Sequence, residues 1–177
     1  MKLWTVSELN KTEASEIQTK YELPAIVAML LQIRNIKTQN EIEDFLFNDS
    51  EIASPFEIKD MDKAVSRIKT ALDNGELICV YGDYDADGVT STALLYSYFD
   101  ATGANAMYYI PSRETEGYGM NNSAVDFLKE KGVKLIVTVD NGIAALEEIE
   151  YASSLGIDTV VTDHHMPTGE LPNACAV

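Results

Sequence analysis

The pattern of apolar and polar positions along the chain changes character near residue 76. Before that point the apolar residues recur mostly at helical spacing, and from Leu77 onward short apolar runs alternate with longer helical segments. Such alternation predicts a parallel sheet whose strands are joined by crossover helices. We therefore expect an α/β fold, with a small helical N-terminal segment over residues 1–76 and a sheet domain over residues 77–177.

The N-terminal segment carries three helix signals. Pro24 stands in the first turn of an apolar run, and Thr38 with Glu41 forms a capping-box pattern ahead of another. A third helix is expected over residues 60–74, because its apolar residues recur at helical spacing and Gly75 follows as a stop signal.

The sheet domain is expected to contain four strands and three helices. Its strands are nearly continuous apolar runs, as in parallel sheets that are covered by helices on both faces. The strands are expected at Leu77–Tyr81, Ala106–Ile110, Leu135–Val139 and Thr159–Thr162. The intervening helices are expected near residues 88–102, 123–131 and 143–155, each closed by a glycine.

A cluster of polar residues directly follows each predicted strand. These clusters are Gly82–Gly88, Pro111–Arg113, Asp140–Gly142 and Asp163–His165. In an open α/β sheet, ligands bind at the carboxyl ends of the strands, where the loops converge. We therefore predict that the four clusters form one functional site.

The first cluster holds three aspartates at alternate positions, Asp83, Asp85 and Asp87. Their charges repel one another by roughly 1 kcal/mol per pair near 4 Å even in water, and a divalent cation such as Mg²⁺ or Mn²⁺ would hold them together. An EF-hand loop begins with the same spacing, but its twelfth position is Leu94 here instead of Glu, and a strand precedes the loop. A phosphoaspartate phosphatase also carries Asp-x-Asp after a strand, but its covalent chemistry does not need two histidines opposite.

His164 and His165, the only histidines of the sequence, follow the fourth predicted strand beside Asp163. Neighbouring side chains on an extended backbone point in opposite directions, so we do not expect both rings to bind one ion. We assign His164 to the metal and His165 to the substrate phosphate or leaving group, with the order of the two left open. Asp163 is expected to orient one of the imidazoles.

Carboxylates with one imidazole favour Mn²⁺ over Zn²⁺ and Ca²⁺. Two such ions about 3.5 to 4 Å apart would activate water and stabilise a leaving oxygen, so metal-assisted phosphoester hydrolysis is the expected reaction class. Arg113 is expected either to clamp a phosphate or to pair with Glu114, Glu116 or another surface acid. Tyr118, between two glycines, is expected either to stack on a base or to pack.

The charge of the chain argues against a simple phosphate-backbone binder. Its 13 Lys and Arg stand against 29 Asp and Glu, and residues 78–177 alone carry 4 cations and 15 anions. We therefore expect this chain alone to bind DNA weakly. Apolar runs never approach the roughly 18 residues of a membrane span, and the two cysteines, Cys79 and Cys175, suit a reducing cytoplasm.

Four motifs at these spacings resemble those of the DHH phosphoesterase superfamily and, within it, the RecJ single-strand-specific exonucleases. The motifs are Val80–Ser91, Ile110–Gly119, Thr138–Gly142 and Asp163–His165. The similarity also extends over Leu23–Pro24, Ser54–Phe56 and Asp60–Ala64.

The resemblance implies a Mn²⁺-dependent hydrolase, a nuclease that degrades single-stranded DNA as an exonuclease from the 5′ end in DNA repair and recombination. It assigns metal binding to four residues with Asp83 close by: Asp85, Asp87, Asp140 and His164. Other members place a His where Tyr81 stands here, so Asp83 is expected to supply the missing ligand. Arg113 and His165 map to residues that face the phosphate.

Family members continue for hundreds of residues, with another metal-binding Asp, a DHHA1 domain and an oligonucleotide-binding fold. We therefore expect an N-terminal fragment that is truncated within its catalytic core and impaired in activity, with two ions, Mn²⁺ or Mg²⁺, in the full-length enzyme. The expected partners are single-stranded DNA, a single-strand-binding protein or a helicase, and no membrane. The alternatives are a small-substrate DHH phosphodiesterase or pyrophosphatase, which the helical lead-in disfavours, and a non-catalytic replication scaffold, which the intact ligands disfavour.

Overall fold

The structure, a computed structural model, describes residues 5–47, 53–167 and 169–177. The chain divides into two compact units, Met1–Ala53 and Ser54–Val177. The helix over Met61–Asp73, α4, belongs to the second unit together with the sheet. The boundary that we expected at residue 76 therefore falls inside this unit, just before its first strand.

Within its described residues, the first unit contains three helices, α1 (Lys11–Lys20), α2 (Ala25–Ile33) and α3 (Gln39–Phe47). Their buried apolar residues form a small core: Ile17, Ala28, Leu31 and Ile42. The predicted capping box of α3 is confirmed, because the backbone N–H of Thr38 donates to Glu41 at 2.9 Å and the backbone N–H of Glu41 donates to Thr38 at 3.3 Å. The sequence analysis did not single out α1, which buries only Ala14 and Ile17.

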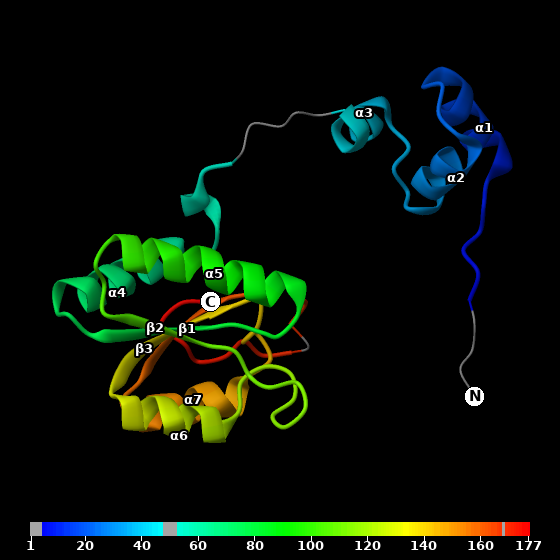
Figure 1. Cartoon of the computed structure of the whole chain (residues 1–177). Helices are drawn as coiled ribbons and strands as arrows, with labels where there is room; N and C mark the ends of the chain where they lie inside the picture. Colours follow the sequence, from blue (N-terminus) through cyan, green and yellow to red (C-terminus); the bar gives the residue numbers. More distant parts are fainter. Residues whose placement is uncertain (1–4, 48–52, 168) are drawn as a thin grey trace. The chain divides into compact units, whose positions relative to one another are not determined.

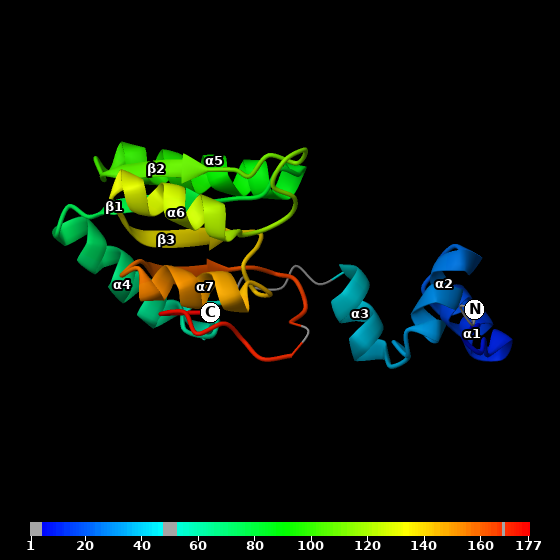
Figure 2. The same cartoon turned by 90° about the horizontal axis from the view of Figure 1, so that it is seen from below.

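The second unit is built on a four-stranded parallel sheet, as predicted (Figure 2). The strands are β1 (Leu77–Tyr81), β2 (Ala106–Tyr109), β3 (Val133–Val139) and β4 (Asp158–Thr162). They lie in the order β2-β1-β3-β4, and every neighbouring pair is parallel. Near the end of the chain, Ala176 forms one further parallel bridge to Val160 of β4.

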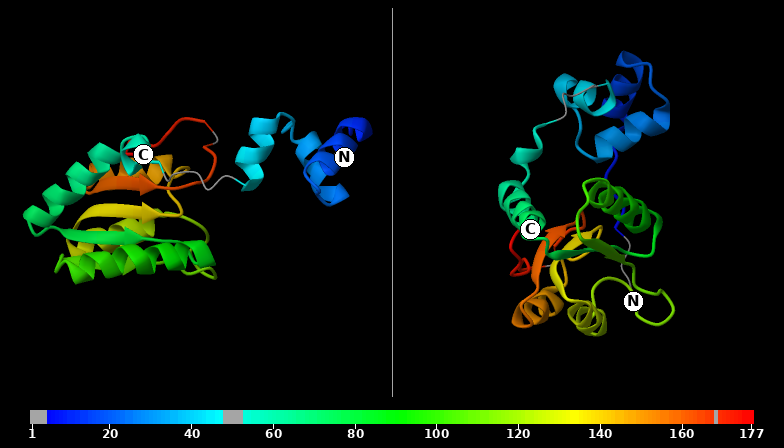
Figure 3. Two further views of the ribbon diagram at one scale, coloured as in Figure 1. Left: turned by 90° about the horizontal axis from the view of Figure 1, so that it is seen from above. Right: turned by 60° about the vertical axis from the view of Figure 1, so that its left-hand side comes forward.

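Helices cover both faces of this sheet (Figure 1 and Figure 3). One face carries α4 and α5 (Ala86–Ala101), and the other carries α6 (Asn122–Lys131) and α7 (Leu146–Ser154). The short 3-10 helix η1 (Pro55–Glu57) precedes α4 in the chain. Successive strand residues point to opposite faces of the sheet. Val80 belongs to the core cluster that includes Phe99 of α5, whereas Cys79 belongs to the cluster that includes Leu128 of α6. This double burial explains why the strands read as continuous apolar runs.

The connections place a topological switch point between β1 and β3. The chain leaves β1 through α5 to reach β2 on one side, and leaves β3 through α7 to reach β4 on the other. The loops after β1 and β3 therefore diverge onto opposite faces, which opens space at the carboxyl ends of these two strands. Among the described residues, no helix combines the length and the apolar character that crossing a bilayer requires.

Candidate metal centre

The loop after β1 folds back tightly on the first turn of α5. Asp85 caps this helix, because its Oδ1 accepts hydrogen bonds from the backbone N–H groups of Asp87 and Gly88, each at 3.0 Å. The bond from Gly88, ahead of other contributions, lowers the pKa of Asp85. A Cβ at Gly88 would lie 2.5 Å from the backbone oxygen of Asp83, so only glycine permits this approach.

Asp83 is the least exposed acid of the loop, at 0%. Neither of its carboxylate oxygens has a hydrogen-bond partner within the described residues. A buried carboxylate without a partner is strongly unfavourable unless a positive charge compensates it. This buried, unpartnered acid is the observation that makes the site fit a bound divalent cation.

The turn after β3 presents Asp140 beside the end of β1. Asp140 has a left-handed backbone with φ of 63°, and its backbone N–H donates to Thr162 at the end of β4 at 3.0 Å. The buried side-chain amide of Asn141 donates to the backbone oxygens of Tyr81 at 3.1 Å and Val139 at 2.9 Å, which ties the ends of β1 and β3 together. The Asp140 carboxylate is therefore fixed at the switch point.

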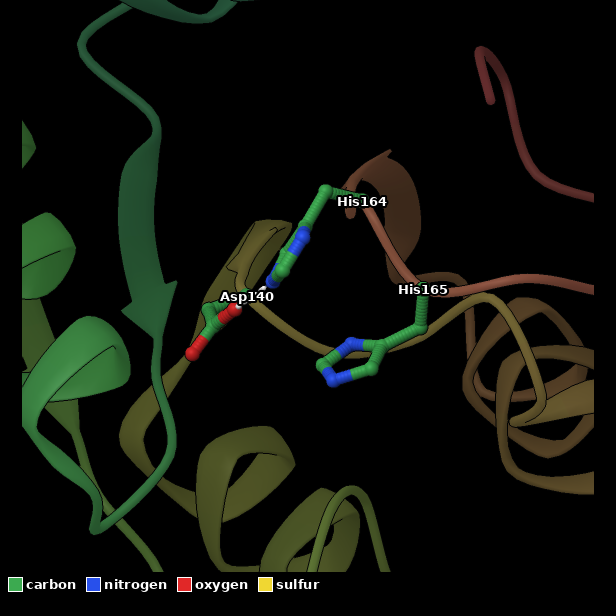
Figure 4. A group of neighbouring side chains, drawn as sticks. All are labelled: Asp140, His164 and His165. Atoms are coloured by element: carbon green, nitrogen blue, oxygen red, sulfur yellow. Dashed lines mark ion pairs between the residues drawn. The ribbon is translucent and has the colours of Figure 1, made fainter. Parts of the chain in front are cut away.

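The two imidazoles lie side by side next to Asp140 (Figure 4). His164 Nε2 is 3.0 Å from Asp140 Oδ1, and one ligand atom each of Asp140, His164 and His165 lies within 4.8 Å of the others. The ring centroids of the two histidines are 4.6 Å apart, so our prediction that the rings point in opposite directions is wrong. The reason is a bend at His165, whose backbone N–H donates to Asp163 at 3.0 Å.

Asp163 contacts His165, not His164. Its Oδ1 lies 2.8 Å from His165 Nδ1, and its Oδ2 accepts from the backbone N–H of Ile143 at 3.0 Å. Burial raises the pKa of Asp163, but the N–H groups of Ile143 and His165 outweigh burial, so the pKa is lowered on balance. The hydrogen bond with Asp163 in turn raises the pKa of His165.

The acids of the β1 loop lie near this cluster without joining it. Burial raises the pKa of Asp140, and the charges of Asp85 and Asp87 raise it further. The structure therefore brings Asp140, His164 and His165 together and places Asp85 and Asp87 within electrostatic reach. The sequence predicts Asp83, Asp85 and Asp87 as metal ligands, and this role is a proposal.

The loop after β2 supplies Tyr118 and Arg113. The Tyr118 hydroxyl donates to the backbone oxygen of Asp140 at 3.3 Å and lies 3.5 Å from His165 Nδ1. Burial, followed by the charge of Asp163, raises the pKa of Tyr118 to about 12. Arg113 is exposed, and its guanidinium carbon lies 5.4 Å from the ring centroid of Tyr84.

Three residues of the site acquire definite contacts that the sequence analysis left unassigned. Tyr81 is fully buried, and its hydroxyl donates to the backbone oxygen of Gly119 at 3.2 Å, so it supports the β2 loop. Asn141 holds the Asp140 turn, and Tyr84 contacts Arg113. The Asn-Gly pair directly after a predicted strand was a sequence signal from which the turn at Asn141 could have been predicted. The contact between Tyr84 and Arg113 could not have been predicted, because the two residues are 29 positions apart in the sequence.

Two hollows flank the cluster. A cavity of about 370 Å³ is bounded by Tyr118, His165 and the residues before α7. A smaller groove of about 250 Å³ runs past Asp140 and His164. There is therefore open space next to each of the two imidazoles.

Comparison with known proteins identifies the family to which the chain belongs. Residues 77–177 match the DHH family, N-terminal domain. Over 175 residues the chain is 41% identical to the single-stranded-DNA-specific exonuclease RecJ of Bacillus subtilis (strain 168), and the match covers 98% of this chain and 22% of that protein.

Two solved structures are also similar. A structure of exonuclease RecJ bound to manganese has a TM-score of 0.64 at 36% identity, and the match covers 71% of this chain and 32% of that one. A structure of RecJ in complex with Mn²⁺ from Thermus thermophilus has a TM-score of 0.62 at 28% identity, and the match covers 96% of this chain and 24% of that one. The chain thus spans between about a fifth and a third of the length of these relatives.

Proposed function

Since the chain belongs to the DHH family, we propose that it forms the N-terminal part of a metal-dependent exonuclease that hydrolyses single-stranded DNA from the 5′ end. The similarity to the RecJ exonuclease of Bacillus subtilis supports the substrate class. The observation that carries the proposal is the cluster of Asp140, His164 and His165 at the ends of β3 and β4. The acids Asp85 and Asp87 of the loop after β1 lie within electrostatic reach of this cluster.

Five residues would hold the divalent metal: Asp83, Asp85, Asp87, Asp140 and His164. Their oxygen-rich donor set with one imidazole suits Mn²⁺ and also accommodates Mg²⁺. The two manganese-bound relatives favour Mn²⁺, and we propose two ions in the full-length protein. When bound, the ions would lower the pKa of a water molecule and stabilise charge on the scissile phosphate.

The remaining residues of the site bind and orient the substrate. Because an ionised carboxylate only accepts hydrogen bonds, Asp163 holds a proton on Nδ1 of His165 and leaves Nε2 free to contact the phosphate or the leaving oxygen. Arg113 binds phosphate oxygens through its guanidinium fork. Tyr118, which is anchored to the Asp140 turn, offers a ring on which a base can stack.

The negative charge of residues 78–177 disfavours binding to the phosphate backbone of DNA. With 4 cations against 15 anions in residues 78–177, this part of the protein binds single-stranded DNA weakly, and basic surfaces elsewhere in the full-length protein contribute most of the affinity. We place the protein in the cytoplasm, in keeping with two free cysteines, and we propose a single-strand-binding protein or a helicase as its partner.

The test measures hydrolysis by the full-length protein with Mn²⁺ on three substrates: single-stranded DNA, dinucleotides and pyrophosphate. We expect single-stranded DNA to be degraded fastest. Preference for dinucleotides or pyrophosphate would instead identify a small-substrate phosphodiesterase, and failure to hydrolyse any of them would identify a non-catalytic scaffold.

Asp140→Ala is the matching variant, and we expect it to abolish turnover while circular dichroism and the melting temperature show an intact fold. Asp100→Ala, which removes an exposed acid near the far end of α5, is the control and should keep full activity. Retained activity in Asp140→Ala would contradict the assignment of the site.

A further inference from the structure

Arg113 is held against the metal-binding loop by an aromatic ring. Its guanidinium carbon lies 5.4 Å from the ring centroid of Tyr84, within the distance at which a cation and an aromatic face attract each other. Tyr84 stands between Asp83 and Asp85, so the ring belongs to the loop that carries the acids. The contact therefore joins the loop after β2 to the loop after β1.

Glu116, one of the two glutamates that we considered as a partner for Arg113, forms its hydrogen bonds elsewhere in the loop after β2. Glu116 accepts hydrogen bonds from the Tyr109 hydroxyl and, at 2.8 Å, from the backbone N–H of Ser112. Throughout the ranges that the structure covers, Arg113 forms no ion pair within 4.0 Å. Arg113, one of the 4 cations that residues 78–177 carry beside 15 anions, therefore stays available for an external anion.

The ring contacts continue from Tyr84 to the imidazoles. Tyr84 and Tyr118 meet edge to face with centroids 6.3 Å apart, and Tyr118 and His165 meet in the same way at 6.1 Å. The Tyr118 hydroxyl also donates to the backbone of Asp140. One row of contacts thus fixes Arg113 relative to the candidate metal centre.

We propose that Tyr84 is a positioning residue, which holds the Arg113 guanidinium ready to bind a phosphate group of a phosphodiester chain next to the scissile one. An aromatic face suits this task because it orients the guanidinium plane and leaves the N–H donors free, whereas a carboxylate would occupy them. The inference rests on the proposed function for the kind of substrate, and on the contacts above for the role of Tyr84.

The experiment measures the affinity of the full-length protein, with Mn²⁺, for a fluorescent single-stranded phosphorothioate oligonucleotide by anisotropy. We expect Tyr84→Leu to weaken binding about two- to fivefold, which corresponds to a cation–π contact at an exposed site, and Tyr84→Phe, which keeps the ring, to bind normally. Arg113→Ala should weaken binding at least as much and reduce the salt dependence by about 0.7 in the log–log slope, the value for one phosphate contact on a single strand.

The double variant separates positioning from a general structural effect. In the Arg113→Ala background, Tyr84→Leu should cause no further loss, and Mn²⁺ affinity measured by electron paramagnetic resonance should stay unchanged in every variant. Tyr98→Leu, at an exposed position on α5, is the control and should bind normally. Additive losses, a matching loss of Mn²⁺ affinity in Tyr84→Leu, or normal binding by Arg113→Ala would overturn the inference.

Binding and hydrolysis distinguish this inference from the proposed function. If the wild-type protein binds the oligonucleotide but does not hydrolyse single-stranded DNA, the proposed function fails and a non-additive pair still supports the role of Tyr84. If hydrolysis proceeds normally and the two losses add, the proposed function stands and the role of Tyr84 is refuted. Absence of any oligonucleotide binding by the wild-type protein would overturn both.

Discussion

Replacing Asp83 by Asn tests whether the fold keeps this acid buried for the sake of a cation. The side chain is 0% exposed, and both of its oxygens lack a hydrogen-bond partner among the described residues. Asn has nearly the same shape but carries no charge. The substitution therefore isolates the energetic effect of the buried charge.

The expected change in stability follows from two opposing contributions. An uncompensated buried charge destabilises a protein by about 3–5 kcal/mol, whereas an unsatisfied neutral amide costs about 1–3 kcal/mol. Without metal, Asp83→Asn should therefore raise the free energy of unfolding by roughly 2 kcal/mol. With Mn²⁺ at a hundred times its dissociation constant, the wild-type protein gains about 2.7 kcal/mol, a gain that the variant largely loses.

Urea denaturation of both proteins, once with a chelator and once with Mn²⁺, measures these free energies. We expect the variant to be the more stable protein with the chelator and the less stable one with Mn²⁺. Asp100→Asn, at an exposed position, is the control and should change neither value. A variant that is less stable than wild type without metal, or that Mn²⁺ stabilises as much as wild type, would refute the reasoning.

Three further substitutions test the surroundings of the site. Gly88→Ala should destabilise the protein by about 1–3 kcal/mol in urea denaturation, because the new Cβ would lie 2.5 Å from the backbone of Asp83. This steric effect should outweigh the helix propensity of Ala, which normally stabilises a helix by about 1 kcal/mol relative to Gly. Unchanged or increased stability would contradict this prediction. Asn141→Ala should lower Mn²⁺ affinity at least about tenfold in calorimetric titration, since it frees the turn that holds Asp140; unaltered affinity would show that the turn needs no such support. Hydrogen bonds from Lys63 and Lys59 lower the pKa of Asp60 from 3.8 to about 2, so the stability that this acid contributes is complete well above pH 3.8 and is lost as the pH falls through about 2. The difference in melting temperature between wild type and Asp60→Asn should therefore shrink toward pH 2, and a constant difference would contradict the assignment.

The sheet was predictable because its strands are buried on both faces. All four strands appear within two residues of their predicted bounds, since an apolar run closed by a glycine or a polar cluster leaves little choice. Helix α1 escaped detection because only Ala14 and Ile17 face the core, which is too weak a periodic signal. Its clearest local mark is Asn10, whose side chain accepts from the backbone N–H groups of Thr12 and Glu13.

The candidate site was predictable in its location but not in its geometry. The carboxyl edge of a parallel sheet gathers the loops, which follows from topology alone. The two imidazoles lie side by side because the backbone bends at His165, where its N–H donates to Asp163. An extended backbone would instead point the two rings in opposite directions, and the sequence does not reveal the bend. The burial of Asp83 depends on the close approach of Gly88, which only the three-dimensional structure shows.

Anomalous diffraction from crystals grown with Mn²⁺ tests the central claim most directly. We expect a manganese peak at the carboxyl ends of β1 and β3, with the carboxylates of Asp83 and Asp140 and the imidazole of His164 at ligand distance. A peak elsewhere on the protein, or no peak at this edge of the sheet at saturating Mn²⁺, would contradict the account.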